Sequence, residues 1–249
     1  MDFDQMEMRL RGKTAIVTGA SSGIGWATAL SFAAEGARVV LTARREDRLL
    51  ELEREIVERG GEAAVFAGDA AEEATAVSVY ELAMERFGAI DVLVNNAGIG
   101  NYKKLVDTSV AEYDELMNSN MRSSFLFSRV VVPKMVKQRS GSIVFVSSVA
   151  GLAGAANEAV YSASKFAQVG FAQSLAEELR GYGIKVCAVC PGGVKTEFAV
   201  GRGRTAEGVA KSPMMNAGDV AEAIVFACMQ PAGARVVQLT VRHMGEPYE

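Results

Sequence analysis

The chain has 249 residues, of which 49% are hydrophobic and 22% are charged, and its formal net charge at pH 7 is −4. This composition excludes an intrinsically disordered chain, and a mildly acidic chain without a basic stripe is a poor candidate for binding nucleic acid. No apolar run approaches the roughly 18–20 residues of a membrane span, and the charged N-terminus MDFDQMEMRLRGK lacks the apolar core of a signal peptide, so we expect a cytoplasmic protein that does not bind a membrane.

Apolar runs rich in β-branched residues alternate with helical patterns along the whole chain. The runs predict strands at residues 14–18, 38–42, 63–67, 91–95, 142–147, 184–190 and 236–241. The helical patterns cover residues 23–34, 46–59, 72–87, 109–138, 159–182 and 217–229. Continuously apolar strands separated by helices are typical of parallel strands buried on both faces. The sequence therefore predicts one α/β domain over residues 1–249, a Rossmann-type doubly wound parallel sheet of about seven strands with helices on both faces.

The first predicted strand runs directly into a glycine-rich turn, TGASSGIG at residues 18–25. Gly19, Gly23 and Gly25 allow a tight turn and a close approach of the backbone to a pyrophosphate, and the next helix directs its N-terminal N–H groups at the phosphates. The spacing differs from the GxGxxG fingerprint and from a Walker A loop, and an ordinary loop is the alternative interpretation.

The end of the second predicted strand indicates which dinucleotide binds. NAD enzymes place an acidic residue there to bind the ribose 2′-hydroxyl, whereas this sequence has Ala43 followed by Arg44 and Arg45. A guanidinium can bind a 2′-phosphate that a carboxylate would repel, so the sequence favours NADP(H) over NAD(H). The alternative is that the two arginines only balance Glu46 and Asp47 at the start of the next helix.

Tyr161 and Lys165 lie on one face of a long predicted helix, near its start. A nearby ammonium stabilises phenolate and lowers the pKa of a tyrosine, which can then exchange a proton with a carbonyl or alcohol oxygen. Ser148 follows a buried strand at the sheet edge where open α/β sheets bind ligands. These three side chains form a candidate catalytic group.

Residues 195–213, KTEFAVGRGRTAEGVAKSP, form a long irregular segment beside the expected ligand edge. We expect a flexible substrate lid there, and an ordinary surface helix with loops is the alternative. Arg202, Arg204 and Lys211 within this segment hint at an anionic substrate group, although such side chains are more often simply solvated.

Cys187 and Cys190 form a CxxC within a predicted strand, where residues i and i+3 face opposite sides. The chain has three Cys and one His. We therefore expect reduced thiols and no metal site.

With these motifs in this order, the chain resembles the classical short-chain dehydrogenases/reductases over nearly its whole length. Further matching elements are Asp69 after the third strand, NNAG at residues 95–98, Asn120, and PGGVKT at residues 191–196. The C-terminal sequence RVVQLTVRHMGEPYE lacks the Asp-Gly-Gly ending that is common in the family and is more similar to the NADP(H)-preferring carbonyl reductase branch.

The resemblance implies an oxidoreductase that transfers hydride between NADP(H) and a carbonyl or alcohol substrate. It makes Tyr161 the general acid/base, Lys165 the group that lowers its pKa and binds the nicotinamide ribose, and Ser148 the residue that holds the substrate oxygen. Asn120 would bend its helix and anchor a water that relays protons from Lys165. The expected cofactor-binding residues are Gly19, Ser21, Ser22, Gly23, Ile24, Gly25, Arg44, Arg45, Asp69, Ala70, Asn96, Ala97, Gly98, Tyr161, Lys165, Pro191, Gly192, Val194 and Thr196.

The resemblance also places the substrate between residues 99–102, residues 150–158, Gly193 and lid residues 198–211. Residues 151–156 are small and apolar, which leaves space for a hydrophobic body. The long helices at residues 109–138 and 159–182 would form the interface of a homodimer or homotetramer.

Other functions are compatible with parts of this pattern: a catalytically silent dinucleotide-binding regulator, an NAD-dependent alcohol dehydrogenase, or a non-redox relative such as an epimerase or dehydratase. A pure binding protein needs no Tyr–Lys pair, and most epimerase relatives carry an additional C-terminal substrate domain. The sequence therefore favours the oxidoreductase.

Overall fold

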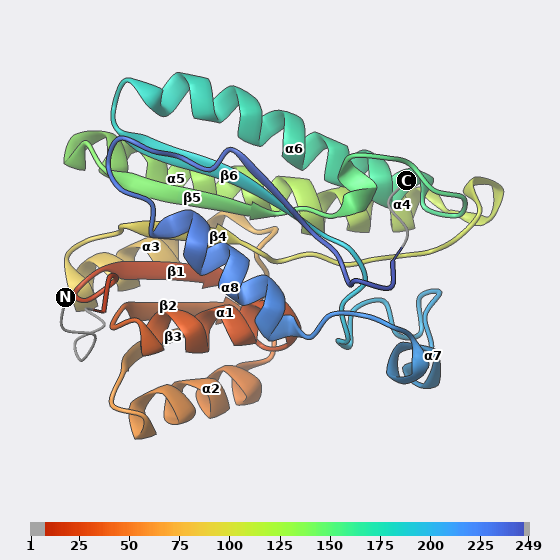
Figure 1. Ribbon diagram of the computed structural model, residues 1–249, viewed down its shortest axis with the longest axis horizontal. Helices are drawn as coiled ribbons and strands as arrows, with labels where there is room; N and C mark the ends of the chain where they lie inside the picture. The colour runs from red at the N-terminus through yellow and green to blue at the C-terminus, as the bar shows by residue number, and fades with distance from the viewer. Residues whose placement is uncertain (1–7, 247–249) are drawn as a thin grey trace.

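Seven parallel strands form one sheet in the computed structural model, which describes residues 8–246 (Figure 1). The strands are β1 (Thr14–Thr18), β2 (Arg38–Ala43), β3 (Glu62–Ala67), β4 (Val92–Asn95), β5 (Gly141–Val146), β6 (Ile184–Pro191) and β7 (Gln238–Val241). Their order is β3-β2-β1-β4-β5-β6-β7, and every neighbouring pair is parallel. The predicted doubly wound Rossmann-type sheet is confirmed, while the expectation for the N-terminus falls partly on residues 1–7, outside the described residues.

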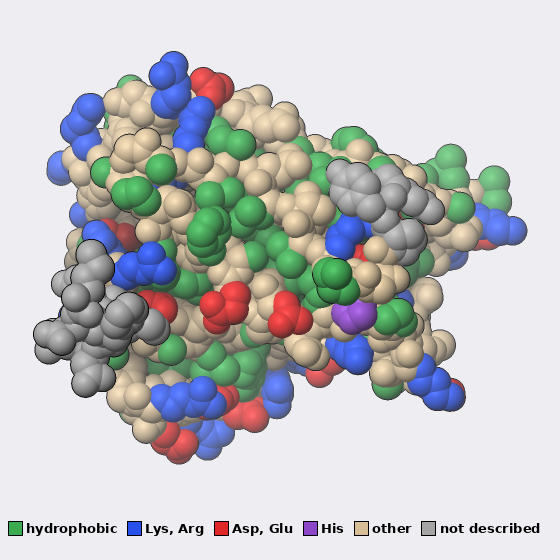
Figure 2. All heavy atoms as spheres, viewed as in Figure 1, with side chains coloured by type: hydrophobic (Ala, Val, Ile, Leu, Met, Phe, Trp, Pro, Cys, Tyr) green, Lys and Arg blue, Asp and Glu red, His purple; other side chains and the backbone are tan. Residues whose placement is uncertain are grey.

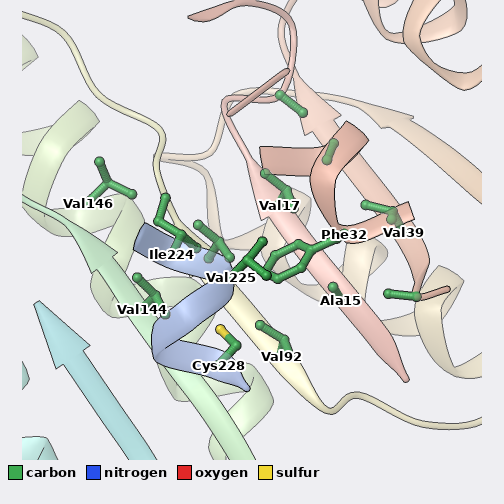
Figure 3. Close-up of a cluster of buried hydrophobic side chains, with 14 of the residues drawn as sticks. Ala15, Val17, Phe32, Val39, Val92, Val144, Val146, Ile224, Val225 and Cys228 are labelled. Carbon is green, nitrogen blue, oxygen red and sulfur yellow. The ribbon is translucent and has the colours of Figure 1, made fainter. Parts of the chain in front are cut away.

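Helices cover both faces of this sheet. They are α1 (Gly23–Ala34), α2 (Glu46–Glu58), α3 (Glu73–Phe87), α4 (Val110–Met117), α5 (Ser123–Gln138), α6 (Ala159–Arg180), α7 (Ala206–Lys211) and α8 (Ala217–Cys228). Side chains of α1, α2 and α8 pack on one face, and those of α3, α5 and α6 pack on the other. Figure 3 shows the first interface, where Phe32 of α1 and Ile224 and Val225 of α8 meet valines of β1, β4 and β5.

Successive residues of the buried strands point to opposite faces, and the two cysteines of β6 illustrate this. Cys187 packs in the cluster beneath α8, whereas Cys190 packs in the cluster beneath α5 and α6. Both are free thiols, as predicted. Burial raises the pKa of Cys187 to about 12 and that of Cys190 to about 11, so both remain protonated core residues.

The helix predicted over residues 109–138 is present as a helical backbone from Val110 to Gln138, and it contains one π-helical turn at the place where the resemblance puts a bend. Helix α4 ends at Met117, a π-helical turn covers Asn118–Arg122, and α5 begins at Ser123. The turn contains the fully buried Asn120, whose side-chain amide bonds both the N–H and the carbonyl of Ile99. These two bonds attach the π-helical turn to the loop after β4. A π turn contains one more residue than a regular helical turn.

The segment at residues 195–213 is more regular than its sequence predicts. Helix α7 begins after Thr205, whose side chain accepts a hydrogen bond from the N–H of Gly208 at 3.0 Å. Ahead of it, Val200 and Arg204 form a β-bridge that closes a tight loop. Its role as a flexible lid stays a prediction.

Charges of both signs are mixed over the molecular surface. Figure 2 shows Lys and Arg side chains interspersed with Asp and Glu on the face covered by α8. Within residues 8–246, no helix combines the length and the apolar character that crossing a membrane requires.

Candidate active site

The strand order brings the ends of β1 and β4 together near the middle of the sheet. The chain leaves β1 toward one side of the sheet and β4 toward the other, so the two loops diverge and leave room for a ligand. Thr18 and Asn96 tie these loops together: Thr18 Oγ1 accepts from the N–H of Asn96 (3.0 Å), and Asn96 Nδ2 donates to the carbonyl of Thr18 (2.9 Å). A cleft of about 410 Å³ opens at this edge.

The structure brings the predicted site residues together around this cleft. All of them line it except Gly25 and Asn120, which lie behind its surface. Of the expected substrate walls, residues 99, 100 and 102 and lid residues 198–200, 202 and 204 line the cleft, whereas residues 150–158 and Gly193 do not. Gly193 instead faces the C-terminal tail, where its N–H donates to Glu246 Oε1 at 2.7 Å.

The glycine-rich turn leaves the start of α1 without a capping side chain. Gly19 and Gly23 adopt positive φ angles of 65° and 56°, and a Cβ on Gly25 would lie 2.3 Å from the carbonyl oxygen of Gly19. Ser22 precedes the helix but forms no side-chain cap bond, and the first turn contains no acidic residue. The first N–H groups of α1 and its positive dipole end can therefore bind a phosphate.

The two predicted 2′-phosphate ligands differ in their surroundings. Arg45 donates from Nε to Ser21 Oγ (3.3 Å) and from Nη2 to the carbonyl of Ser21 (3.3 Å), and its Nη1 pairs with Glu197 at 3.0 Å. Arg45 therefore links the glycine-rich turn to the segment at residues 195–213. Arg44 is exposed at the mouth of the cleft, and no ion pair within residues 8–246 occupies its guanidinium.

Ser148, Tyr161 and Lys165 face the cleft from β5 and α6. Ser148 follows β5, its Oγ accepts from the N–H of Ala150 (3.1 Å), and it hydrogen-bonds Tyr161. Tyr161 and Lys165 lie in the first two turns of α6, with Lys165 Nζ 5.8 Å from the centre of the Tyr161 ring. The three predicted catalytic side chains thus share one site.

Burial controls the protonation of this site. It raises the pKa of Tyr161 well above 10.0, with further contributions from Tyr102 and an opposing hydrogen bond from Ser148. It lowers the pKa of Lys165 to about 8. Burial disfavours the charged form of both groups. That Lys165 lowers the pKa of Tyr161 stays a prediction.

Gln168 is the residue near the catalytic group that the sequence interpretation missed. It is fully buried; its Oε1 accepts from Lys165 Nζ (3.0 Å), and its Nε2 donates to the carbonyl of Asn120 (2.9 Å) and to Ser124 Oγ (2.9 Å). The resemblance assigns a relay water to Asn120, and the carbonyl of this residue accepts a hydrogen bond from the side-chain amide of Gln168. The sequence could have indicated this residue, because Gln168 follows Lys165 by one helical turn and lies on the same helix face.

Two aromatic rings cover the other side of Tyr161. The ring of Tyr102 meets it edge-on with centroids 5.7 Å apart, and Phe198 lies 5.9 Å away at 55°. Tyr102 comes from the loop after β4, and Phe198 comes from the segment at residues 195–213. This end of the cleft therefore presents aromatic surface beside the Tyr161 hydroxyl.

Residues 13–207 match the family model described as short chain dehydrogenase. The chain belongs to this family. As a short-chain dehydrogenase it is an oxidoreductase, and members of the family bind a nicotinamide cofactor.

Similar proteins include other short-chain dehydrogenases. An uncharacterized oxidoreductase of Thermotoga maritima is 39% identical over 237 residues, covering 91% of this chain and 94% of the relative. A 3-oxoacyl-[acyl-carrier-protein] reductase of the same organism is 41% identical over 189 residues, covering 76% and 77%. A solved metagenomic short-chain oxidoreductase in complex with NADP is 34% identical with a TM-score of 0.83, covering 96% of this chain and all of the other.

The residues of this short-chain dehydrogenase fit a nicotinamide dinucleotide. The uncapped start of α1 suits a pyrophosphate. Gly25 and Gly98 leave no room for a side chain: a Cβ on Gly98 would lie 2.8 Å from Asn120 Oδ1. Gly68, Asp69 and Ala70 line one end of the cleft, and the catalytic side chains line the other. One elongated ligand can therefore reach from the loop after β3 to Tyr161.

Proposed function

We propose that the protein is an NADP(H)-dependent carbonyl reductase or alcohol dehydrogenase in which Tyr161 is the general acid/base. The observation that carries the proposal is the presence of Tyr161, Ser148 and Lys165 in one cleft with the glycine-rich turn. A relative named as a 3-oxoacyl reductase supports a carbonyl substrate. When bound, the nicotinamide would supply or accept the hydride.

The cofactor preference follows from the end of β2. Arg44 is the arginine available to a 2′-phosphate, because Arg45 bonds Ser21 and Glu197. The solved relative with NADP supports this preference. Along the same cleft, Pro191, Gly192, Val194 and Thr196 would contact the nicotinamide end, and Asp69 and Ala70 the adenine end.

Tyr161 would supply the proton that carbonyl reduction requires. With its pKa raised by burial, the phenol carries its proton at neutral pH and can donate it to the oxygen of a carbonyl. Ser148 would hold that oxygen, and Lys165 would bind the ribose of the cofactor. Asn120 fixes the start of α6, because its Nδ2 donates to Ser164 Oγ (2.9 Å), which in turn donates to the carbonyl of Tyr161 (2.7 Å).

The decisive experiment follows NADPH absorbance with aldehydes, ketones and diketones, beside NADH and a Tyr161→Phe variant. Turnover that disappears in the variant supports the reductase. Tight NADPH binding without turnover on any carbonyl would favour a silent dinucleotide-binding regulator, and a preference for NADH would favour an NAD-dependent dehydrogenase.

We further propose that residues 1–249 form one domain with a lid at about residues 195–213, and that the protein is a cytoplasmic homodimer or homotetramer. Apolar side chains on α5 and α6 support the oligomer: Phe125 is 43% exposed and Phe166 is 46% exposed. Uncovered phenylalanines on helices of one sheet face are typical of an interface.

A further inference from the structure

The basic side chains of the segment at residues 195–213 differ in their partners. Arg202 forms a two-pronged ion pair with Glu115 (2.8 and 2.9 Å), and Lys211 pairs with Glu207 one turn away in α7. Arg204 forms no ion pair with any described residue. Of these cations, Arg204 is therefore the one that forms no ion pair within residues 8–246.

Arg204 lies directly beside the aromatic wall of the catalytic group. Its guanidinium carbon is 5.2 Å from the ring centre of Tyr102 and 6.0 Å from that of Phe198. Both rings contact Tyr161, and Arg204 lines the same cleft. The rings of Tyr102 and Phe198 therefore lie next to both Arg204 and Tyr161, the proposed proton donor.

Backbone hydrogen bonds hold Arg204 at this position. Its N–H donates to the carbonyl of Ala199 (3.1 Å), and its own carbonyl accepts from Gly201 (2.9 Å). The N–H of Tyr102 donates to the carbonyl of Arg202 at 2.9 Å, which joins this loop to the loop after β4. A Cβ on Gly203 would lie 2.5 Å from the Cβ of Tyr102, so the two loops are in close contact. A guanidinium on a closed loop, beside two aromatic rings and hydrogen-bonded to the side chain of Tyr102, is a preorganised anion ligand.

We propose that Arg204 binds a carboxylate of the substrate, so that the enzyme acts on oxo acids or hydroxy acids in preference to neutral ketones and alcohols. This inference rests on the proposed reductase function and names its substrate class. The substrate would place its carbonyl at Tyr161 and Ser148 and its carboxylate at Arg204, with the chain between them against Tyr102 and Phe198.

Glu158, which precedes α6, is a carboxylate that interacts electrostatically with Arg204. Burial raises the pKa of its carboxyl group, and Arg204 acts against that rise. The two groups do not form an ion pair. Arg204 could instead serve only to balance Glu158, and the experiment must separate that role from substrate binding.

Kinetics on matched pairs test the proposal: 2-, 4- and 5-oxohexanoate against their methyl esters, with NADPH and with NADH. Each pair shares the ketone and the carbon skeleton and differs in charge. We expect the wild type to favour the acid by tenfold or more in kcat/KM for at least one pair, and Arg204→Met to bring that ratio close to one. Lys211→Met, which removes a cation outside the cleft, should keep the wild-type ratio.

Calorimetric binding of hexanoate and of methyl hexanoate to the full chain gives a readout that needs no turnover. Hexanoate binding that is lost in Arg204→Met and kept in Lys211→Met supports the anion site even if no ketone is reduced, in which case only the reductase proposal falls. Two results together would overturn the inference and leave the reductase proposal intact. The wild type would reduce the esters with an acid-to-ester ratio of kcat/KM near one, and Arg204→Met would not weaken the binding of hexanoate. These results would restrict Arg204 to balancing Glu158.

Discussion

Lys165 Nζ donates a hydrogen bond to Gln168 Oε1 at 3.0 Å, one turn further along α6. The amide of Gln168 then continues to the carbonyl of Asn120 in the π-helical turn. A neutral amide that accepts from an ammonium favours its charged form. Gln168 therefore positions Lys165 and counteracts part of the burial that lowers its pKa to about 8.

Replacing Gln168 should move the pH dependence of the reaction. Gln168→Met removes the acceptor, so the pKa of Lys165 should fall below about 8 and the alkaline limb of kcat/KM should move to lower pH. Gln168→Glu supplies a carboxylate, so the limb should move to higher pH. If Gln168 only packs in the core, both variants should lower kcat/KM equally at every pH and leave the pH of both limbs unchanged. That profile would contradict the assignment of Gln168 as a positioning residue for Lys165.

Lys165 should also cost stability at neutral pH. Its pKa is 10.5 in an exposed lysine and about 8 in the folded protein, so between these values only the unfolded chain holds the proton. The contribution of Lys165 to the free energy of unfolding therefore rises as pH increases from about 8 to about 10.5. Below this range the buried charge costs on the order of 3 kcal/mol.

Urea unfolding of the wild type and of Lys165→Met checks this sign. The variant should be more stable at pH 7, and its advantage should shrink by pH 10. An advantage that stays constant over this range would show that Lys165 does not titrate with a lowered pKa.

Gly25→Ala should disrupt cofactor binding, because a Cβ there would lie 2.3 Å from the carbonyl oxygen of Gly19 and 2.5 Å from Asn96 Nδ2. We expect the affinity for NADPH to fall by more than tenfold in a fluorescence titration. Gly170→Ala is the matched control, because it adds the same methyl group to α6 with no atom within 4 Å. It should keep the affinity and stabilise the helix by up to about 1 kcal/mol.

Arg44→Ala should weaken NADPH far more than NADH. Loss of a guanidinium from a 2′-phosphate should raise the KM for NADPH by at least tenfold more than the KM for NADH. Arg54→Ala, which removes an exposed arginine of α2, is the control. Equal effects of Arg44→Ala on both cofactors would indicate that Arg44 does not bind the 2′-phosphate.

The exposed phenylalanines of α5 and α6 predict an interface between copies. Phe125→Glu and Phe166→Glu together should lower the mass measured by light scattering on a sizing column, because a buried carboxylate without a partner opposes association. Val57→Glu, at an exposed apolar position of α2, should leave the mass unchanged. A wild type that is already monomeric would refute the proposed oligomer.

The local sequence pattern was sufficient to predict the sheet, the glycine-rich turn and the Tyr161–Lys165 pair. The apolar runs of β1, β5 and β6 are short-range signals, and the parallel order follows from strands that alternate with helices. The glycines of the turn at residues 18–25 lie within a few residues of one another, and so do Tyr161 and Lys165. Their chemistry is readable because spacing along a strand, turn or helix fixes which groups share a face.

The sequence by itself thus determined the fold class, the family resemblance and the residues around the cleft. The tertiary structure alone decided how those residues are partnered: Gln168 against Asn120, Arg45 against Glu197, Arg202 against Glu115, and Arg204 left beside two aromatic rings. It also decided that the helix over residues 110–138 contains a π-helical turn at Asn118–Arg122. The physical reason is distance along the chain. Each of these contacts joins residues from separate elements, and their pairing depends on how the whole sheet packs rather than on any local period.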